Sequence, residues 1–138
     1  MPNKVDRIVI DTNLWISFLI SNTYSKLDIL IQENKVKIIF SNELLYEFLD
    51  VVARPKLKKY FTTEDVNKIL TSIQNHSDFI AVKSKADVCR DKKDNFLLAL
   101  CEDGKADYLL TGDEDLLVLK KYKKTAILKI ESYLQKKL

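Results

Sequence analysis

VDRIVIDTN, residues 5–13, is the stretch that decides the fold. Residues 5–10 are rich in β-branched side chains and almost continuous in hydrophobicity, which predicts a strand that is buried on both faces. Asp11, Thr12 and Asn13 offer side chains that can cap a helix, and residues 14–20 continue as one. Asp11 is therefore expected at the carboxyl end of a buried strand, next to the first turn of a helix.

The rest of the chain repeats this alternation of strand and helix. Further strands are predicted at residues 36–40, 79–82, 108–110 and 126–128. Helices are predicted at residues 25–34, from a cap at Ser41 or Asn42 to Val52, from a cap at Thr62 or Thr63 to His76, at 94–102 and after the last strand, with a helical turn at 115–119. Strands separated by helices indicate an α/β fold with a central parallel sheet covered on both faces.

Composition predicts an ordinary soluble domain. The chain has 138 residues, of which 46% are hydrophobic and 31% charged, so we expect one globular domain over residues 1–138. A net charge of +3 permits a polyanionic partner without requiring one. There is no secretory segment or membrane-spanning run, and Cys89 and Cys101 follow no disulfide or zinc spacing, so we expect a cytoplasmic protein with no membrane partner. Trp15 and Cys101 are expected in the core.

Four acidic residues follow or lie within the predicted elements: Asp11, Glu47, Asp94 and Asp113. Asp11 and Asp113 come after strands, and ligands of parallel sheets bind beyond the carboxyl ends of the strands. Taken singly, Asp94 is equally well a helix cap, as is Asp91, and periodicity leaves Glu47 at the border of a solvated acidic face. Gathered at one edge of the sheet, such carboxylates form a site for a hard divalent cation, which points to metal-dependent chemistry on phosphate.

The chain resembles the PIN-domain family, also described as PilT N-terminus-like, along nearly its whole length. The resemblance rests on four segments, IDTN at 10–13, SNELLYE at 41–47, RDKKDNFL at 90–97 and YLLTGDEDLL at 108–117. The last two, in this order, are most similar to the branch that holds toxins of toxin–antitoxin systems. Lys92 departs from the family pattern, which has proline at this position; the change affects a turn and no ligand.

This resemblance implies a three-layer α/β/α sandwich and an endoribonuclease that cleaves single-stranded RNA with a metal-activated water. One or two Mg²⁺ or Mn²⁺ ions would be bound by Asp11, Glu47, Asp94 and Asp113, with Asp115 as a fifth member that varies within the family. Thr12, Asn13 and Thr111 would position these ligands or the substrate. The toxin branch further implies a cognate antitoxin protein as a partner, and a homodimer is an additional expectation.

Substrate binding requires positive charge beside these carboxylates. The basic candidates are Arg54, Lys56, Lys58, Lys59, Lys92 and Lys93. Such groups contact phosphates and raise the affinity for RNA, but they do not choose a sequence. Tyr46, Tyr60 and Phe61 are either packing residues or platforms on which unpaired bases stack.

Two other classes of function stay open at this point. An acidic-cluster phosphatase or phosphotransferase would use Asp11 as a covalent nucleophile, but the residue two positions later is Asn13 and not a second aspartate, and no partner lysine motif follows. A non-catalytic RNA- or protein-binding module would keep the fold without the reaction, although clustered like charges argue against an abandoned site. His76 is the only histidine, which excludes a ribonuclease mechanism that needs two.

Overall fold

The centre of the structure, a computed structural model that describes residues 4–21 and 23–137, is a sheet. Residues 1–3, 22 and 138 of the predicted domain lie outside the described ranges, within which six strands have the order β3-β2-β1-β4-β6-β5. They are β1 (Asp6–Ile10), β2 (Val36–Phe40), β3 (Ser77–Phe79), β4 (Tyr108–Leu110), β5 (Lys121–Tyr122) and β6 (Thr125–Leu128). Every neighbouring pair is parallel except β5 with β6, so the predicted parallel sheet is confirmed.

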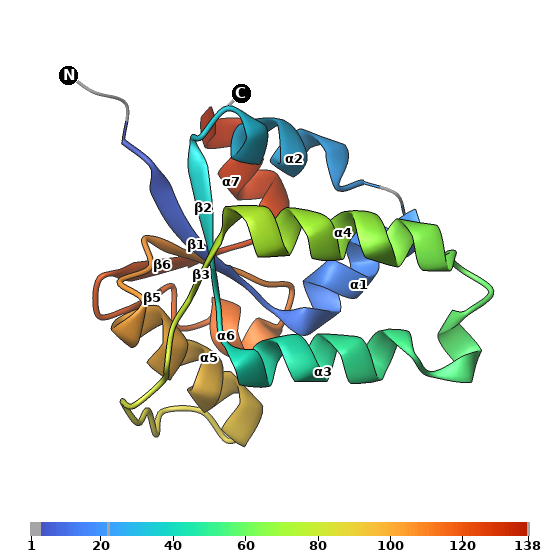
Figure 1. The fold of residues 1–138 in the computed structure, drawn as a ribbon. Coiled ribbons are helices and arrows are strands. Elements are labelled where there is room, and N and C mark those ends of the chain that lie inside the picture. Colours follow the sequence, from blue (N-terminus) through green and yellow to red (C-terminus); the bar gives the residue numbers. More distant parts are fainter. Residues whose placement is uncertain (1–3, 22, 138) are drawn as a thin grey trace.

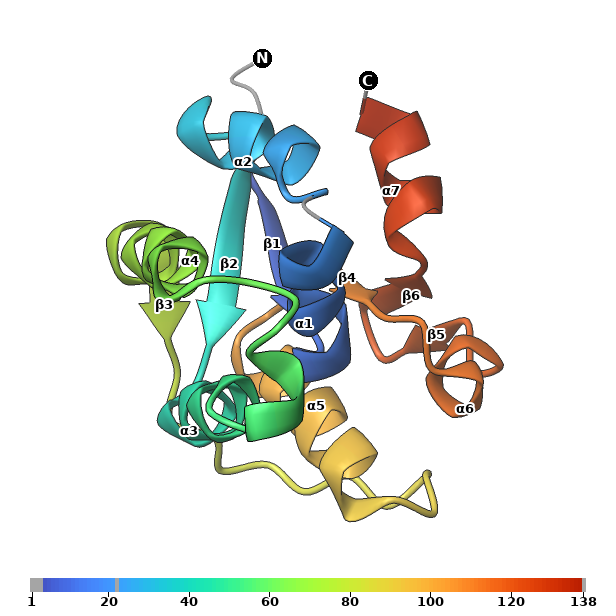
Figure 2. The same cartoon turned by 90° about the vertical axis from the view of Figure 1, so that its right-hand side faces the viewer.

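Helices cover both faces of this sheet, as Figures 1 and 2 show. They are α1 (Thr12–Ser21), α2 (Ser25–Gln32), α3 (Asn42–Val52), α4 (Thr63–His76), α5 (Lys92–Asp103), α6 (Glu114–Leu117) and α7 (Ile130–Lys137), with a 3-10 turn at Pro55–Leu57. The chain moves along the sheet from β1 to β3 and then returns to β4, so right-handed crossovers place α1–α4 on one face and α5 on the other. The three-layer α/β/α architecture is confirmed.

Side-chain caps explain where the helices around the site begin. The Ser41 hydroxyl accepts a hydrogen bond from the amide of Leu44 at 3.0 Å, and α3 starts there as predicted. Thr62 and Asp65 form a reciprocal capping box at the start of α4. Asp91 caps α5 by accepting from the amide of Lys93 at 2.8 Å. Because Asp91 takes this role, the helix begins two residues before Asp94.

The third strand and the hairpin of β5 with β6 differ from the expectation. We predicted a strand at 79–82, but β3 ends at Phe79, which pairs with Phe40 at the end of β2. β2 extends no further, so the chain leaves the sheet and runs irregularly through residues 80–91. The side chain of Asp103 holds this segment by accepting the amides of Lys83 and Ser84 at 2.6 and 2.8 Å. The two-residue strand β5 was not predicted, because so short an edge strand has no sequence periodicity.

The core lies on both faces of β1 and β4. Ile8, Val9 and Ile10 have no exposed surface, and Trp15 and Cys101 are buried as expected. The buried carboxylate of Asp6 accepts a hydrogen bond from the Tyr133 hydroxyl at 2.7 Å and lies 2.8 Å from Nζ of Lys137. These contacts fix α7 against the start of β1. No described helix is long and apolar enough to span a membrane.

Gly104 sets how closely α5 approaches the sheet. A Cβ atom at this position would lie 2.5 Å from Cγ2 of Ile39 on β2 and 3.0 Å from the carbonyl oxygen of Leu100. Neither is the far end of a flexible side chain, so a methyl group would push the end of α5 away from β2. Nε of Arg7 also donates to the Gly104 carbonyl at 2.9 Å, which locks the same end to β1.

Gly104→Ala is therefore expected to lower the free energy of unfolding by about 1–3 kcal/mol, because it overpacks a closed contact. Gly112→Ala is the matched control, since a Cβ there meets nothing within 4 Å. Urea unfolding followed by circular dichroism measures both. Equal stability of the two variants would contradict the close approach of α5 to β2.

Candidate metal centre

The register of β1 with β4 determines which residues lie beside Asp11, the first carboxylate of the site. Ile10 pairs with Leu110, and Leu110 pairs with Leu128. The ladder continues one step further, since the amide of Asp11 donates to the Leu110 carbonyl at 3.3 Å and the amide of Thr111 donates to the Leu128 carbonyl at 3.0 Å. Asp11 and Thr111 therefore stand side by side at the carboxyl edge of the sheet.

Thr111 links Asp11 to Asp113. Its hydroxyl donates to Oδ2 of Asp11 and accepts from the amide of Asp113 at 3.0 Å. Oδ1 of Asp11 accepts from the amide of Leu14 at 2.7 Å, so both oxygens of this carboxylate are held in place. Hydrogen bonds of this kind orient an acidic side chain before any ligand arrives. Thr111 is thus placed to act as the positioning residue that was predicted.

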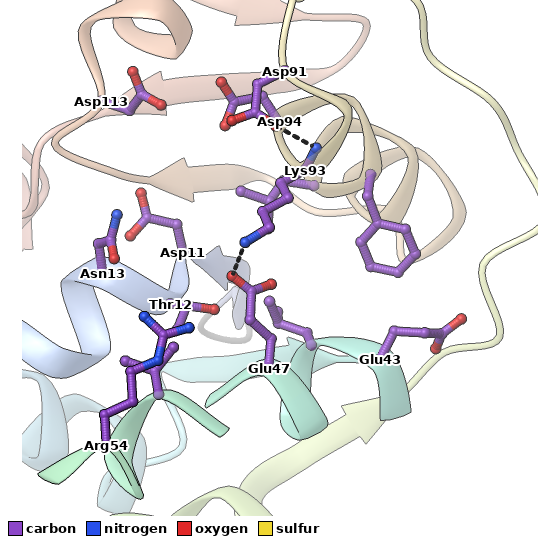
Figure 3. A pocket seen from close by; sticks show the side chains of 14 residues that line it. Asp11, Thr12, Asn13, Glu43, Glu47, Arg54, Asp91, Lys93, Asp94 and Asp113 are labelled. Atoms are coloured by element: carbon purple, nitrogen blue, oxygen red, sulfur yellow. Dashed lines mark hydrogen bonds and ion pairs between the residues drawn. The ribbon is translucent and has the colours of Figure 1, made fainter. Parts of the chain in front are cut away.

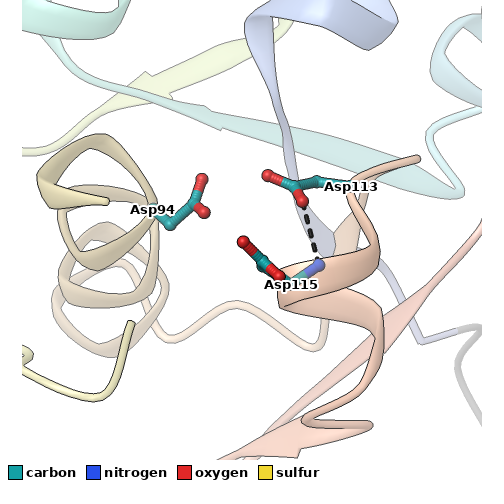
Figure 4. Close-up of side chains that lie close together, drawn as sticks. All are labelled: Asp94, Asp113 and Asp115. Carbon is teal, nitrogen blue, oxygen red and sulfur yellow. Dashed lines mark hydrogen bonds between the residues drawn. The ribbon is translucent and has the colours of Figure 1, made fainter. Parts of the chain in front are cut away.

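Three carboxylates lie close enough to share one cation. Asp94, Asp113 and Asp115 each offer an oxygen, and these oxygens lie within 4.8 Å of one another. Figure 4 shows Asp94 reaching from α5 towards Asp113 and Asp115 at the start of α6. Asp113 caps that short helix by accepting the amide of Asp115 at 2.9 Å. Asp115, predicted as the variable fifth member, is therefore a spatial neighbour of the predicted ligands.

Asp11 and Glu47 stand outside that trio but line the same cleft. The cleft lies between α3 and α5 and has a volume of about 380 Å³. Figure 3 shows Asp11 between Asp113 and Glu47, with Thr12 beside it. All four carboxylates predicted as catalytic therefore line one space. Thr12 is 6% exposed, and its hydroxyl has no hydrogen-bond partner within the described residues. Asn13 also lines the cleft, whereas Asp115 does not.

The predicted basic residues divide into two groups. Arg54 and Lys93 line the cleft, and Nζ of Lys93 lies 3.9 Å from Oε1 of Glu47. The other four are exposed and do not line it: Lys56, Lys58, Lys59 and Lys92. Their contact with a substrate stays a prediction. Among the aromatic candidates, Tyr46 and Tyr60 are exposed, whereas Phe61 is buried in the core and therefore has the packing role of the two that the sequence left open.

Sequence reasoning did not assign several residues around the site. Glu43 and Asp91 also line the cleft, and Arg90 lies 3.5 Å from Oδ2 of Asp115. Glu43 could have been found, since it stands one helical turn before Glu47 on the same face of α3. The place of Arg90 could not, because it depends on the irregular path of residues 80–91.

Electrostatics show that these carboxylates repel one another. The pKa of Asp94 is raised from 3.8 to about 6, mainly by burial and in addition by the charges of Asp113 and Asp91. Burial likewise raises the pKa of Asp11, against the hydrogen bonds from Thr111 and Leu14 that lower it. Carboxylate oxygens that are kept this close together despite burial and repulsion fit a hard divalent cation such as Mg²⁺ or Mn²⁺.

Comparisons with known proteins agree with this geometry. A family model described as a PIN domain matches residues 7–115. The protein MJ1680 of Methanocaldococcus jannaschii, itself uncharacterized, is 37% identical over 117 residues, which are 83% of this chain and 75% of that protein. The crystal structure of PAE2754 from Pyrobaculum aerophilum matches with a TM-score of 0.54 at 20% identity, over 96% of this chain and 88% of that one. At this identity the likeness concerns the fold alone.

The raised pKa of Asp94 predicts how stability depends on pH in the absence of metal. The folded protein holds the proton more tightly than the unfolded chain, so the free energy of unfolding falls as pH rises from about 4 through about 6. In a chelating buffer, wild type should lose about 1 kcal/mol more than Asp94→Asn between pH 5 and pH 7. Urea unfolding at both pH values measures this, and equal losses in the two proteins would contradict the raised pKa of Asp94.

Proposed function

The chain belongs to the PIN-domain family, and from this premise we propose that it is a Mg²⁺- or Mn²⁺-dependent endoribonuclease that cleaves single-stranded RNA. PIN domains are typically metal-dependent nucleases. The observation that supports the proposal best is the set of carboxylates at one edge of the sheet, with Asp94, Asp113 and Asp115 within reach of a single ion and Asp11 beside them.

In this proposal, different residues of the chain hold the cation and orient the attacking water. Asp94, Asp113 and Asp115 would hold the cation, and Asp11 is fixed beside them by Thr111 and Leu14. When bound, the cation lowers the pKa of a water and offsets negative charge on the phosphate. Glu47, across the cleft, offers a carboxylate that could orient that water or take up its proton.

Arg54 and Lys93 supply the positive charge that a polyanion meets at this cleft. Both line the cleft, so each could contact a phosphate held over the carboxylates. In this role they raise affinity and make binding sensitive to salt, without reading a sequence. Thr12, whose buried hydroxyl has no partner within the described residues, is a further group able to orient a water or a substrate oxygen.

The local geometry argues against the phosphatase alternative. A covalent mechanism would use an oxygen of Asp11 to attack phosphorus. The residue two positions later is Asn13 and not a second acidic group. Asp11 instead lines the cleft together with Asp94 and Asp113, which have oxygens close enough to share one ion, and this arrangement favours a role beside a cation. A non-catalytic module is the alternative that activity measurements must exclude.

The decisive measurement is cleavage of a fluorescently labelled, unstructured RNA with Mg²⁺ or Mn²⁺. Wild type should cleave, and Asp11→Asn and Asp94→Asn should each lower the rate at least about 100-fold, because each removes charge at the metal centre. A chelator should abolish cleavage by wild type. Asp28→Asn, which replaces an acidic residue on α2 in the same way, is the matched control and should leave the rate unchanged. Equal residual cleavage by wild type and the two site variants would sink the proposal.

A toxin role is a narrower proposal that rests on the family resemblance. Induced expression of wild type in a bacterial host should arrest growth, whereas Asp11→Asn should be harmless because it lacks the carboxylate. Rescue by co-expression of the gene neighbouring this one would support a cognate antitoxin as partner. Normal growth during expression of a protein that cleaves RNA in vitro would contradict the toxin role while leaving the nuclease intact. A homodimer also stays a prediction.

A further inference from the structure

A second cleft lies on the other side of the acidic edge. It has a volume of about 520 Å³, and it shares Asp11, Asn13 and Asp113 with the cleft between α3 and α5. Figure 3 shows Asn13 and Glu47 on opposite sides of Asp11 in the first cleft. An extended ligand whose phosphate lies over the carboxylates can therefore enter both clefts at once.

Strand register builds the far wall of this second cleft. Leu128 at the end of β6 pairs with Leu110, so the next residue, Lys129, stands beside Thr111 at the carboxyl edge of the sheet. α7 begins at Ile130 and places Glu131 in its first turn. The opposite wall comes from α1, where Asn13 and Ser17 are one turn apart on the same face.

The lining of the cleft has an apolar part and a polar part. Leu14 and Ile130 are half-buried and offer apolar surface. Asn13, Ser17 and Glu131 are exposed. Within residues 4–21 and 23–137, their side chains and that of Lys129 make no hydrogen bond or ion pair, in contrast to Lys93 and Glu47 in the first cleft. Free polar groups beside an apolar wall suit a flat ligand with a polar edge.

A nucleobase fits this lining better than a phosphate does. Lys129 is the one cation among the residues that line the cleft, and Glu131 offsets its charge, while Asp11 and Asp113 belong to the proposed cation site. The interior of the cleft therefore has no excess positive charge for a phosphate, while Lys129 can contact a backbone phosphate at the rim. An ionised carboxylate only accepts hydrogen bonds. Guanine presents two N–H groups side by side on its Watson–Crick edge, which one carboxylate accepts together, whereas uracil presents one N–H between two carbonyl oxygens.

We propose that the second cleft binds the base of a nucleotide next to the scissile phosphate, and that Glu131 makes it select guanine. This inference rests on the proposed nuclease function and adds to it a base preference on one side of the cleavage site. Single-stranded RNA is commonly read in this way, by the edges of unstacked bases. Asn13 and Ser17 add hydrogen-bonding groups opposite Glu131, and Leu14 and Ile130 contact the face of the base.

The first test uses RNA oligonucleotides with a single cleavage position. They differ from one another in one base, which stands either directly before or directly after that position. Wild type should cleave the guanine-containing substrate about 10-fold or more faster than the uracil-containing one, since a bidentate base contact discriminates by about 1–3 kcal/mol. Glu131→Gln should bring this ratio to within about 2-fold. Glu64→Gln is the matched control, because Glu64 is likewise an exposed acidic residue in the first turn of a helix, and should keep the preference. An unchanged preference in Glu131→Gln would overturn the inference.

A second test does not depend on cleavage. Guanosine, cytidine, adenosine and uridine 5′-monophosphates are titrated into the protein at millimolar concentration in the presence of Mg²⁺, and amide shifts are followed by NMR. Guanosine monophosphate should shift Ser17, Gly112 and Ile130 most, and these shifts should weaken in Glu131→Gln. Such shifts in a protein that cleaves no RNA would support the base site and defeat the nuclease proposal. RNA cleavage without these shifts, and with the same preference in Glu131→Gln, would leave the nuclease standing and defeat the base site.

Discussion

The parallel pairing of β1 with β4 is the constraint on which the candidate site depends. Ile10 and Leu110 end their strands in register, which leaves Asp11 beside Thr111 and brings Asp113 within two residues of the same point. The pairing is stabilised by burial, because the side chains of both strand ends are fully buried. Core packing thus provides the free energy that holds two carboxylates together at an edge where, alone, they would separate.

Local hydrogen bonds decide which carboxylates stay available at that edge. Asp11 and Asp113 each cap a helix, so helix termini help to keep them in place. On α5 the capping role falls to Asp91, which leaves Asp94 buried, free of a backbone bond and facing Asp113. The raised pKa of Asp94 shows that this position disfavours the ionised form of its carboxyl group. A helix that began at Asp94 would tie this carboxylate to its own backbone and remove it from the cluster.

The sequence predicts the site as far as it depends on strand ends. Asp11 and Asp113 follow from buried strands that stop at acidic residues, and the structure places them together. Periodicity leaves Glu47 at the border between a solvated face and a cleft, so its place came from family resemblance. Capping preference could not separate Asp91 from Asp94, since both stand where a helix could begin. The second cleft was beyond sequence reasoning, because Lys129 meets the site only through the pairing of β6 with β4.

Charge at the cleft links cation binding to substrate binding. The overall net charge of +3 suggests a surface that attracts polyanions, yet the first cleft is lined by six acidic residues and only Arg54 and Lys93 among basic ones. Lys93 already lies beside Glu47, which reduces the positive charge it can offer. A phosphate that approaches this edge without a cation meets net repulsion. Under the proposed function, RNA would therefore need the cation to approach this edge, so substrate binding and catalysis should require the same ion.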